Sequence, residues 1–429
     1  MSKQASGAER KSPYGEAIDA WVDEHRQEFL QAVSELVRIP TENRPPRGDE
    51  LAGQEYLRRL MTRFGLETDL FNLDEVEGLT EHPAYWPGRE YTDRPNLVGI
   101  FRGSGGGRSL GFSSHMDTAS CDPLPWEESE PFRGEVKEGR LYGRGSYDMK
   151  GGLIASLYAA RAVRELGISL RGDVFIESVV DEEWGGSNGT LAARLRGYNP
   201  DAMIVPEPSH MVICPAHLGV RLYRFTARGQ AGMRFGGENL ANPAVAMARV
   251  IQGFTEFAAA RQSRPLPAIY AGGNPPPIDV MGVHARGYGV PRECTLDVHI
   301  HFFEGETPEG LQAAVDEFVQ AMSALPELEG VSLTAEPVSR FLEPSSIPAD
   351  HPIVSCAVRC MEELPHRQVI VRGAPFACDA YVFNKHSPTP ALILGPGGAR
   401  AHAADEYVLV DDLVDLVRVY ARMIVDWCQ

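Results

Sequence analysis

Histidine and acidic residues that could bind metal ions recur in five short segments, each at the end of an expected strand. The segments are SSHMDT with His115 and Asp117, GRGSYDMKGG with Asp148, VVDEEWGG with Glu182 and Glu183, VPEPS with Glu207, and GPGGARAHAADE with His402. Imidazole nitrogens and carboxylate oxygens are donors that zinc, cobalt and manganese ions accept. One carboxylate can bridge two ions about 3.5–4 Å apart, which together acidify a water and polarise a carbonyl group. These residue types therefore predict hydrolytic chemistry at two divalent ions, with Zn²⁺ expected and Co²⁺ or Mn²⁺ compatible.

Each segment alone has a simpler interpretation. A His-x-Asp sequence occurs by chance in many proteins, and a Glu-Glu pair is more often the solvated start of a helix. The shared position of the five segments favours the metal site, because all of them follow apolar strands within one α/β pattern. Ligands usually gather at that edge of a sheet.

Helices and strands alternate through most of the chain, which is typical of a sheet with helices on both faces. Apolar periodicity and the composition of short apolar runs predict the elements. The expected helices are 14–39, 51–64, 153–166, 191–196 and 411–427, and the expected strands are NLVGIF, SLGFSS, DVFIESVV and AMIVP. A long loop is expected at 74–95, and the GSGGG segment between the first two strands is expected to be a hairpin turn.

The rhythm changes after about Cys214, where the order becomes strand, helix, strand, strand, helix, strand. This order is typical of a small ferredoxin-like layer. The sequence predicts an α/β catalytic domain made of residues 1–213 and 337–429, interrupted by an α+β domain at 214–336. A length of 429 residues agrees with two domains.

The composition narrows the class of protein. The net charge of -18 disfavours nucleic acid and anionic membranes as partners. We find no apolar run of about 18 residues and no apolar leader, and the seven cysteines include no CxxC pair. These features predict a cytoplasmic protein with reduced thiols.

Taken together, the five segments resemble the M20 family of metallopeptidases and deacylases, which includes acetylornithine deacetylase, succinyl-diaminopimelate desuccinylase, aminoacylase and carboxypeptidase G. The match runs from about Leu51 to the C-terminus, and GRGSYDMKGG with the later Glu-Glu pair is its most specific part. The resemblance implies a zinc-peptidase-like catalytic domain with an inserted ferredoxin-like lid and dimerisation domain, and hence a homodimer.

The resemblance also implies a role for each residue of the five segments. Asp117 would accept the N–H of His115, and Glu182 would be the general base that moves a proton from the attacking water to the leaving amine. Adjacent residues on an extended segment point in opposite directions, which would separate the tasks of the two glutamates. The implied metal ligands are His115 and Glu207 for one ion, Glu183 and His402 for the other, and Asp148 as the bridge.

The expected lid departs from the family at three positions that would contact substrate. Met233 stands where the family carries a histidine that stabilises the oxyanion, and a thioether cannot donate a hydrogen bond. Arg234 and His217 are candidates to replace it. Tyr288 and His301 align with an asparagine and an arginine that contact the acyl-amino-acid portion of family substrates. The three departures suggest a substrate without the usual α-carboxylate.

The leading hypothesis is metal-dependent hydrolysis of an amide in an N-acylated small amine or amino acid. The alternatives are a carboxypeptidase or dipeptidase with the same metal chemistry, and a family member with altered chemistry in a specialised pathway. A non-catalytic binding protein on the same fold is disfavoured, because degenerate enzymes usually lose ligands or the base, whereas all implied ligands and Glu182 are present here.

Overall fold

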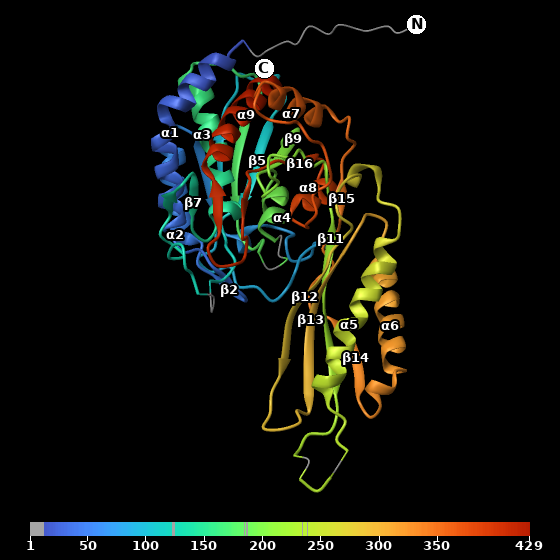
Figure 1. The fold of residues 1–429 in the computed structure, drawn as a ribbon. Coiled ribbons are helices and arrows are strands. Elements are labelled where there is room, and N and C mark those ends of the chain that lie inside the picture. Colours follow the sequence, from blue (N-terminus) through green and yellow to red (C-terminus); the bar gives the residue numbers. More distant parts are fainter. Residues whose placement is uncertain (1–12, 122–124, 184, 186–187, 234, 238) are drawn as a thin grey trace, which may run out of the picture. The chain divides into compact units, whose positions relative to one another are not determined.

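The computed structural model describes residues 13–121, 125–183, 185, 188–233, 235–237 and 239–429 and divides the chain into two compact units. Unit 1 comprises Met1–Pro215, Ile347–Val371 and Asp379–Gln429. Unit 2 comprises Ala216–Ser346 and Arg372–Cys378, so it interrupts the chain of unit 1. Figure 1 shows the elements of both units in sequence colours.

Unit 2 extends further along the chain than the expected end at residue 336. Strand β15 (Ser345–Ser346) pairs with β10 (Ala216–His217), so the chain up to Ser346 is bonded to the start of unit 2. The short return segment is held in the same way, because the Ala374 N–H donates to the carbonyl of Ala216 at 2.7 Å. Backbone hydrogen bonds of this kind do not depend on the hydrophobicity of the side chains, so the hydrophobic pattern that predicted the boundary could not reveal them.

Unit 1 is built around a six-stranded sheet with the order β16-β9-β5-β8-β4-β3. The first four of these strands run parallel, while β4 and β3 add to the edge in antiparallel pairs. The central strands are buried along their length, as expected for a sheet covered on both faces. The strands are β3 (Glu67–Phe71), β4 (Asn96–Phe101), β5 (Leu110–His115), β8 (Val174–Val179), β9 (Ala202–Val205) and β16 (Ala391–Ile393).

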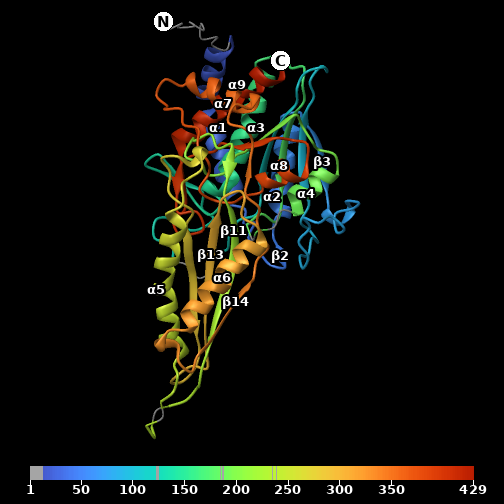
Figure 2. The same cartoon turned by 90° about the vertical axis from the view of Figure 1, so that its right-hand side faces the viewer.

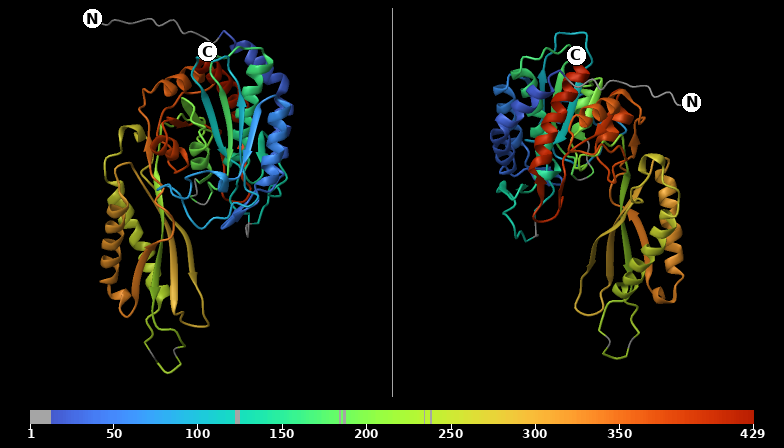
Figure 3. Two further views of the ribbon diagram at one scale, coloured as in Figure 1. Left: turned by 180° about the vertical axis from the view of Figure 1, so that it is seen from behind. Right: turned by 45° about the horizontal axis from the view of Figure 1, so that its top comes forward.

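Helices cover both faces of this sheet, which confirms the predicted α/β class (Figures 1 and 3). One face packs against α1 (Gly15–Val37), α2 (Leu51–Arg63), α3 (Gly151–Glu165) and α9 (Val410–Cys428), with α7 (Pro352–Glu362) against α9. The other face carries α4 (Asn188–Leu195) and α8 (Ala380–His386). Within the described part of the chain, no helix combines the length and apolar character that a membrane span needs.

The predicted hairpin at GSGGG is wrong. Strands β4 and β5, which flank it, do not pair with each other, because β8 lies between them in the sheet. Strand β8 pairs antiparallel with β4 and parallel with β5. The glycine-rich segment therefore crosses the end of a strand that comes some 70 residues later in the chain, a long-range pairing that local turn signals cannot reveal.

A second sheet in unit 1 has the order β17-β18-β7-β6 and is entirely antiparallel. Its strands are β6 (Glu135–Lys137), β7 (Arg140–Tyr142), β17 (Gly398–Ala399) and β18 (Tyr407–Leu409). It brings together two segments that are distant in the sequence, and the site described below takes side chains from both. A two-stranded pair, β1 (Asn43–Arg44) with β2 (Arg47–Gly48), follows α1.

Unit 2 confirms the predicted ferredoxin-like order (Figure 2). Its four-stranded antiparallel sheet has the order β12-β13-β11-β14, and its two helices follow β11 and β13. Alternate side chains of β13 are buried, and Phe225, Phe254 and Phe318 meet in the core between sheet and helices. The elements are β11 (Gly219–Arg228), α5 (Pro243–Gln262), β12 (Ile278–Ala285), β13 (Glu293–Phe302), α6 (Pro308–Ser323) and β14 (Ser332–Pro337).

Candidate metal centre

Three neighbouring parallel strands of the main sheet end beside one another and deliver four of the expected side chains. Strand β5 ends at His115, Glu182 and Glu183 follow β8, and Glu207 follows β9. Because β8, β5 and β9 are adjacent and parallel, their carboxyl ends meet at one edge of the sheet. Chain segments nearly 100 residues apart are thereby brought together.

The second sheet supplies the remaining two side chains. Strand β7 leads into the short turn Ser146–Lys150 (η2), which carries Asp148, and β17 with β18 frames the loop that carries His402. Strand β18 pairs with β7, so the two segments lie together although more than 250 residues separate them.

The two histidines face opposite oxygens of Asp148. His115 Nε2 lies 3.1 Å from Asp148 Oδ1, and His402 Nε2 lies 3.2 Å from Asp148 Oδ2. Each histidine has a further carboxylate: Glu207 Oε1 is 3.7 Å from His115 Nε2, and Glu183 Oε2 is 2.7 Å from His402 Nε2. The arrangement therefore has two histidine–carboxylate pairs with one carboxylate between them.

Glu182 lies beside the first of these pairs. Its Oε2 is 4.0 Å from His115 Nε2, whereas the carboxylate of Glu183 contacts His402. Donor atoms of His115, Glu182 and Glu207 lie within 4.8 Å of one another, and so do those of His115, Asp148 and Glu183. Nitrogen and oxygen donors at this spacing fit small divalent ions.

Burial makes the carboxylates of this centre costly to ionise without nearby positive charge. Loss of hydration raises the pKa of Glu182 well above its usual value, although the charge of His115 opposes this effect. Burial, together with the charge of Asp148, likewise raises the pKa of Glu207. A pair of divalent ions would supply the positive charge that these groups need.

The pKa values of the two histidines are raised as well, but by the nearby negative charges rather than by burial. Burial alone would lower the pKa of His115, but the hydrogen bond with Asp148 and the charges of Glu207 and Glu182 raise it well above its usual value. The nearby charge of Glu183 raises the pKa of His402 in the same way. In the absence of metal, therefore, protons on these imidazoles partly neutralise the carboxylates.

Asp117 makes different contacts from those expected. The Nδ1 of His115 lies 2.8 Å from the main-chain carbonyl of Asp117 but 3.9 Å from its carboxylate. A carbonyl can only accept, so this contact places the proton on Nδ1 and leaves Nε2 free to face the carboxylates. The Asp117 carboxylate instead accepts the backbone N–H groups of Glu182 at 3.3 Å and Glu183 at 3.0 Å.

Sequence reasoning missed Glu406, which fixes the turn that carries Asp148. Its Oε1 accepts the backbone N–H groups of Tyr147 at 3.0 Å and Asp148 at 3.1 Å, and its Oε2 accepts a hydrogen bond from Arg144 at 2.6 Å. Both Glu406 and Arg144 are almost completely buried. Glu406 is the last residue of the segment that contains His402, so the sequence does place it near the expected site. An acidic residue in a loop, however, does not reveal which groups it will bond.

A small pocket adjoins the centre, and its lining includes His115, Glu182 and Glu207. Asp379 and Phe383 also line it, and neither was singled out from the sequence. Asp379 accepts a hydrogen bond from Thr190 Oγ1 at 2.6 Å. After burial and the charge of Glu207, its charge also helps to raise the pKa of Glu182.

The expected substrate-binding residues of unit 2 differ in exposure. Met233 is half exposed and Tyr288 fully exposed, while Arg234 lies outside the described residues. His217 is buried, with Nδ1 2.8 Å from the carbonyl of Leu218 and Nε2 2.9 Å from Ser345 Oγ. Burial, with the charge of nearby His299, lowers the pKa of His301 to about 4, so this imidazole is neutral at pH 7.

Comparisons with known proteins point to one family. Residues 111–426 match the family model described as peptidase family M20/M25/M40. The chain is 27% identical to the N-formyl-4-amino-5-aminomethyl-2-methylpyrimidine deformylase of Halalkalibacterium halodurans, over 96% of this chain and 97% of that protein. It is 28% identical to the succinyl-diaminopimelate desuccinylase of Rhodospirillum centenum, over 82% of this chain and 89% of that protein.

Solved structures agree at the level of the fold. Human carnosine dipeptidase 1 superposes with a TM-score of 0.75 at 14% identity, covering 97% of this chain and 99% of that one. The YXEP protein of Bacillus subtilis, described as a dinuclear metal-binding peptidase of the M20 family, gives a TM-score of 0.60 at 14% identity, covering 95% and 99%. The family match spans well over half of the chain, so the chain belongs to peptidase family M20/M25/M40 and is a metal-dependent hydrolase of amide bonds.

Proposed function

We propose that this enzyme removes a formyl or another short acyl group from the nitrogen of a small amine, with two Zn²⁺ ions bound at the candidate metal centre. The arrangement of Asp148 between two histidine–carboxylate pairs carries the proposal, because it offers a bridging ligand to two ions. His115 and Glu207 would hold one ion, and Glu183 and His402 the other. Co²⁺ or Mn²⁺ would fit the same donors.

Bound ions would supply Lewis acidity, which favours deprotonation of the attacking water and polarises the carbonyl of the substrate. Glu182 is the general base: it takes a proton from the water as the new C–O bond forms at the carbonyl carbon. It then gives that proton to the amide nitrogen as the C–N bond breaks. The products are the carboxylate of the acyl group, formate in the case of a formyl substrate, and the amine, which keeps the second proton of the water as its ammonium form.

Two observations favour an amine substrate without a carboxylate. The relatives that match nearly the whole chain are named for an aminomethylpyrimidine, a compound with no carboxylate in its name. His301, which aligns with an arginine of the family, is neutral at pH 7 because burial lowers its pKa, so it is a poor partner for a carboxylate. A carboxypeptidase or dipeptidase would need such a partner for the carboxyl end of its substrate.

Further observations bear on the oligomeric state and the cellular compartment of the enzyme. We infer that unit 2 is the lid and dimerisation domain and that the chain works as a cytoplasmic homodimer. The exposed apolar side chains of strand β12, an edge of the unit 2 sheet, support the dimer. Reduced cysteines, seven in the chain with no disulfide among the described residues, support the cytoplasm.

The proposal is tested by supplying the purified enzyme with Zn²⁺ and measuring hydrolysis of an N-formyl aminomethylpyrimidine, an N-acetyl amino acid and a dipeptide. We expect formate release from the first substrate to be fastest. Glu182→Gln should lower turnover about 10²–10⁴-fold, the range for loss of an acid–base group. Glu24→Gln, which alters an exposed glutamate of α1, is the matched control. Faster cleavage of the dipeptide, or full activity of Glu182→Gln, would contradict the proposal.

A further inference from the structure

A buried aspartate directly before Glu182 has an uncommon backbone conformation. Asp181 is fully buried and has a φ of 70°, in the left-handed region that few residues other than glycine adopt. Aspartate tolerates this region better than most residues, but it still needs surroundings that hold it there. The chain turns at this residue as it leaves β8, immediately before the two glutamates of the metal centre.

The long loop at 74–95 supplies partners for Asp181. Tyr91 donates its hydroxyl hydrogen to Asp181 Oδ2 at 2.8 Å, and Arg94 Nη2 lies 3.6 Å from Oδ1. Arg89 adds a second cation, with Nε 3.2 Å from Oδ1. The buried aspartate is thus held by a hydroxyl and two guanidinium groups from one stretch of chain.

Arg94 is itself fixed in place. Its guanidinium forms a two-pronged hydrogen bond with Glu50, with Nε–Oε2 at 2.8 Å and Nη2–Oε1 at 2.6 Å, and both side chains are almost fully buried. Fork-shaped pairs of this kind are strong and specify orientation. Glu50 lies directly before α2, so the contact ties the segment to the body of unit 1.

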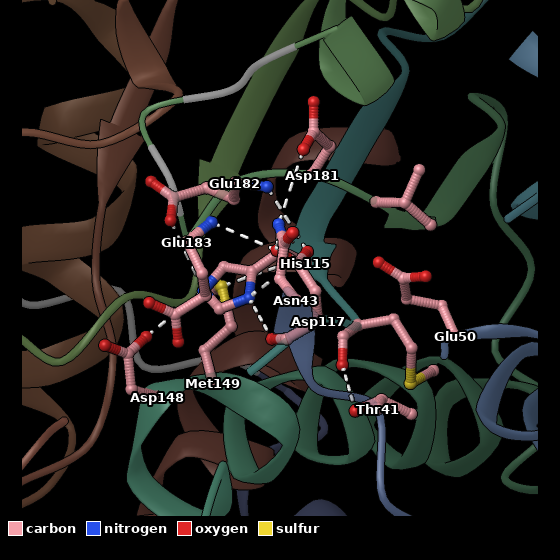
Figure 4. Close-up of polar contacts among 12 residues, drawn as sticks. Thr41, Asn43, Glu50, His115, Asp117, Asp148, Met149, Asp181, Glu182 and Glu183 are labelled. Carbon is pink, nitrogen blue, oxygen red and sulfur yellow. Dashed lines mark hydrogen bonds and ion pairs between the residues drawn. The ribbon is translucent and has the colours of Figure 1, made fainter. Parts of the chain in front are cut away.

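A second set of contacts reaches the same turn from the other side. Asn43 donates from Nδ2 to Asp117 Oδ2 at 2.8 Å and to Asp181 Oδ1 at 3.4 Å. Asp117 in turn accepts the backbone N–H groups of Glu182 and Glu183 (Figure 4). Asn43 therefore connects two carboxylates. One is that of Asp117, which accepts the backbone N–H groups of the two glutamates, and the other is that of Asp181, at the turn before them.

We propose that Tyr91 and Arg94 are positioning residues for Glu182, acting through Asp181. The inference rests on the proposed function, because it concerns the geometry of the general base. Tyr91 and Arg94 hold the Asp181 carboxylate, Asp181 holds the left-handed turn, and the turn directs Glu182, the next residue, toward His115. Glu183 is held separately, because its backbone N–H donates to Asp117 and its carboxylate contacts His402. Tyr91, Arg94 and Asp181 are not among the residues proposed to bind the ions, so their effect on the reaction would pass through Glu182.

The role predicts an effect on turnover that is separate from binding. A base displaced by about 1 Å can cost about a hundredfold in rate, whereas the donors that hold the ions and the substrate remain in place. Removing only the hydroxyl of Tyr91, or only the charge of Asp181, should therefore lower kcat while KM and metal content stay near those of the wild type. Contacts that served stability alone would change the unfolding transition and leave kcat unaltered.

The experiment compares the zinc-loaded enzyme with Tyr91→Phe, Asp181→Asn, Arg94→Lys and Arg94→Met. Asparagine also tolerates the left-handed region, so Asp181→Asn removes charge without forcing a new backbone. We expect Tyr91→Phe and Asp181→Asn to lower kcat about tenfold to a hundredfold. Arg94→Lys, which keeps the charge, should recover part of the activity that Arg94→Met loses. Tyr56→Phe, which removes a hydroxyl bonded to the Glu35 carboxylate of α1, is the matched control, and its kcat should match that of the wild type.

Unchanged kcat in both Tyr91→Phe and Asp181→Asn would overturn the inference, and so would a loss of metal that accounts for the loss of rate. These two variants keep the test decisive if Arg94→Met fails to fold. Glu182→Gln in the same series separates this failure from that of the proposed function. If Glu182→Gln is fully active, the base assignment itself is wrong, whereas an inactive Glu182→Gln beside fully active Tyr91→Phe and Asp181→Asn rejects only the positioning role.

Discussion

At the scale of single residues, Glu182 and Glu183 show how adjacent carboxylates can face different partners. Alternation along an extended strand would point the two side chains in opposite directions, but β8 ends at Val179 and both glutamates follow the left-handed Asp181. Glu182 lies near His115 and Glu183 near His402. Their positions follow from this turn and from the hydrogen bonds that their backbone N–H groups donate to Asp117. The divergence of the two side chains was predicted, but for a different physical reason.

The buried pair of Arg144 and Glu406 should be essential to the stability of the turn at Asp148. Arg144→Met would leave the Glu406 carboxylate buried without its cation, a change that usually costs about 3–5 kcal/mol. Urea unfolding of the wild type and of Arg144→Met measures the difference in free energy of unfolding. Arg47→Met is the control, because the ion pair of Arg47 with Glu90 is largely exposed and should contribute at most about 1 kcal/mol. Equal losses in the two variants would argue against the assigned role of Glu406.

At the scale of elements, the sequence predicted most helices and strands of unit 1 and the order of unit 2, because apolar periodicity is a local property. Pairing between distant strands cannot be predicted from a local property, as the position of β8 between β4 and β5 shows. The same limit applies to the site. Residues that follow apolar strands could be picked out, whereas Asn43, Asp181 and Glu406 act through partners more than 70 residues away in the sequence.

Helix α9 should lose stability in acid through Asp415. This carboxylate is mostly buried, which raises its pKa, but hydrogen bonds from His366, Arg367 and Arg418 outweigh burial and lower the pKa below its usual value. A lowered pKa means that the contribution to folding is complete above the unfolded value of about 3.9 and is lost as the pH falls below it.

Unfolding measured as a function of pH tests this contribution. The difference in free energy of unfolding between the wild type and Asp415→Asn should shrink as the pH falls below about 4. A difference that persists unchanged to pH 3 would show that the ionised carboxylate is not what stabilises the helix.

At the scale of the whole molecule, the excess of acidic residues and the edge of the unit 2 sheet suggest how copies of the chain behave in solution. A net charge of -18 opposes non-specific association. Strand β12 nevertheless presents Val280, Met281 and Val283, each at least two-fifths exposed, at an edge that pairs only with β13 among the described strands. Specific pairing at this edge would bury apolar surface that is otherwise left in water.

The proposed homodimer should therefore depend on β12. Light scattering should give about twice the chain mass of 47.0 kDa for the wild type. Met281→Lys should weaken the dimer, because it places a charge in the contact, whereas Val136→Lys alters an equally exposed apolar residue of unit 1 and should not. A monomeric wild type, or a dimer indifferent to Met281→Lys, would exclude this edge as the contact.

The most direct test of the central claim is the metal content of the enzyme, measured by plasma emission spectroscopy on protein purified without chelator. The arrangement of Asp148 between two histidine–carboxylate pairs predicts about two ions per chain in the wild type. His402→Ala removes a ligand of one pair only, so its content should fall toward one ion, and hydrolysis should fall with it. A wild type that binds no metal when Zn²⁺ or Co²⁺ is supplied, or a content unchanged in His402→Ala, would contradict the two-metal centre.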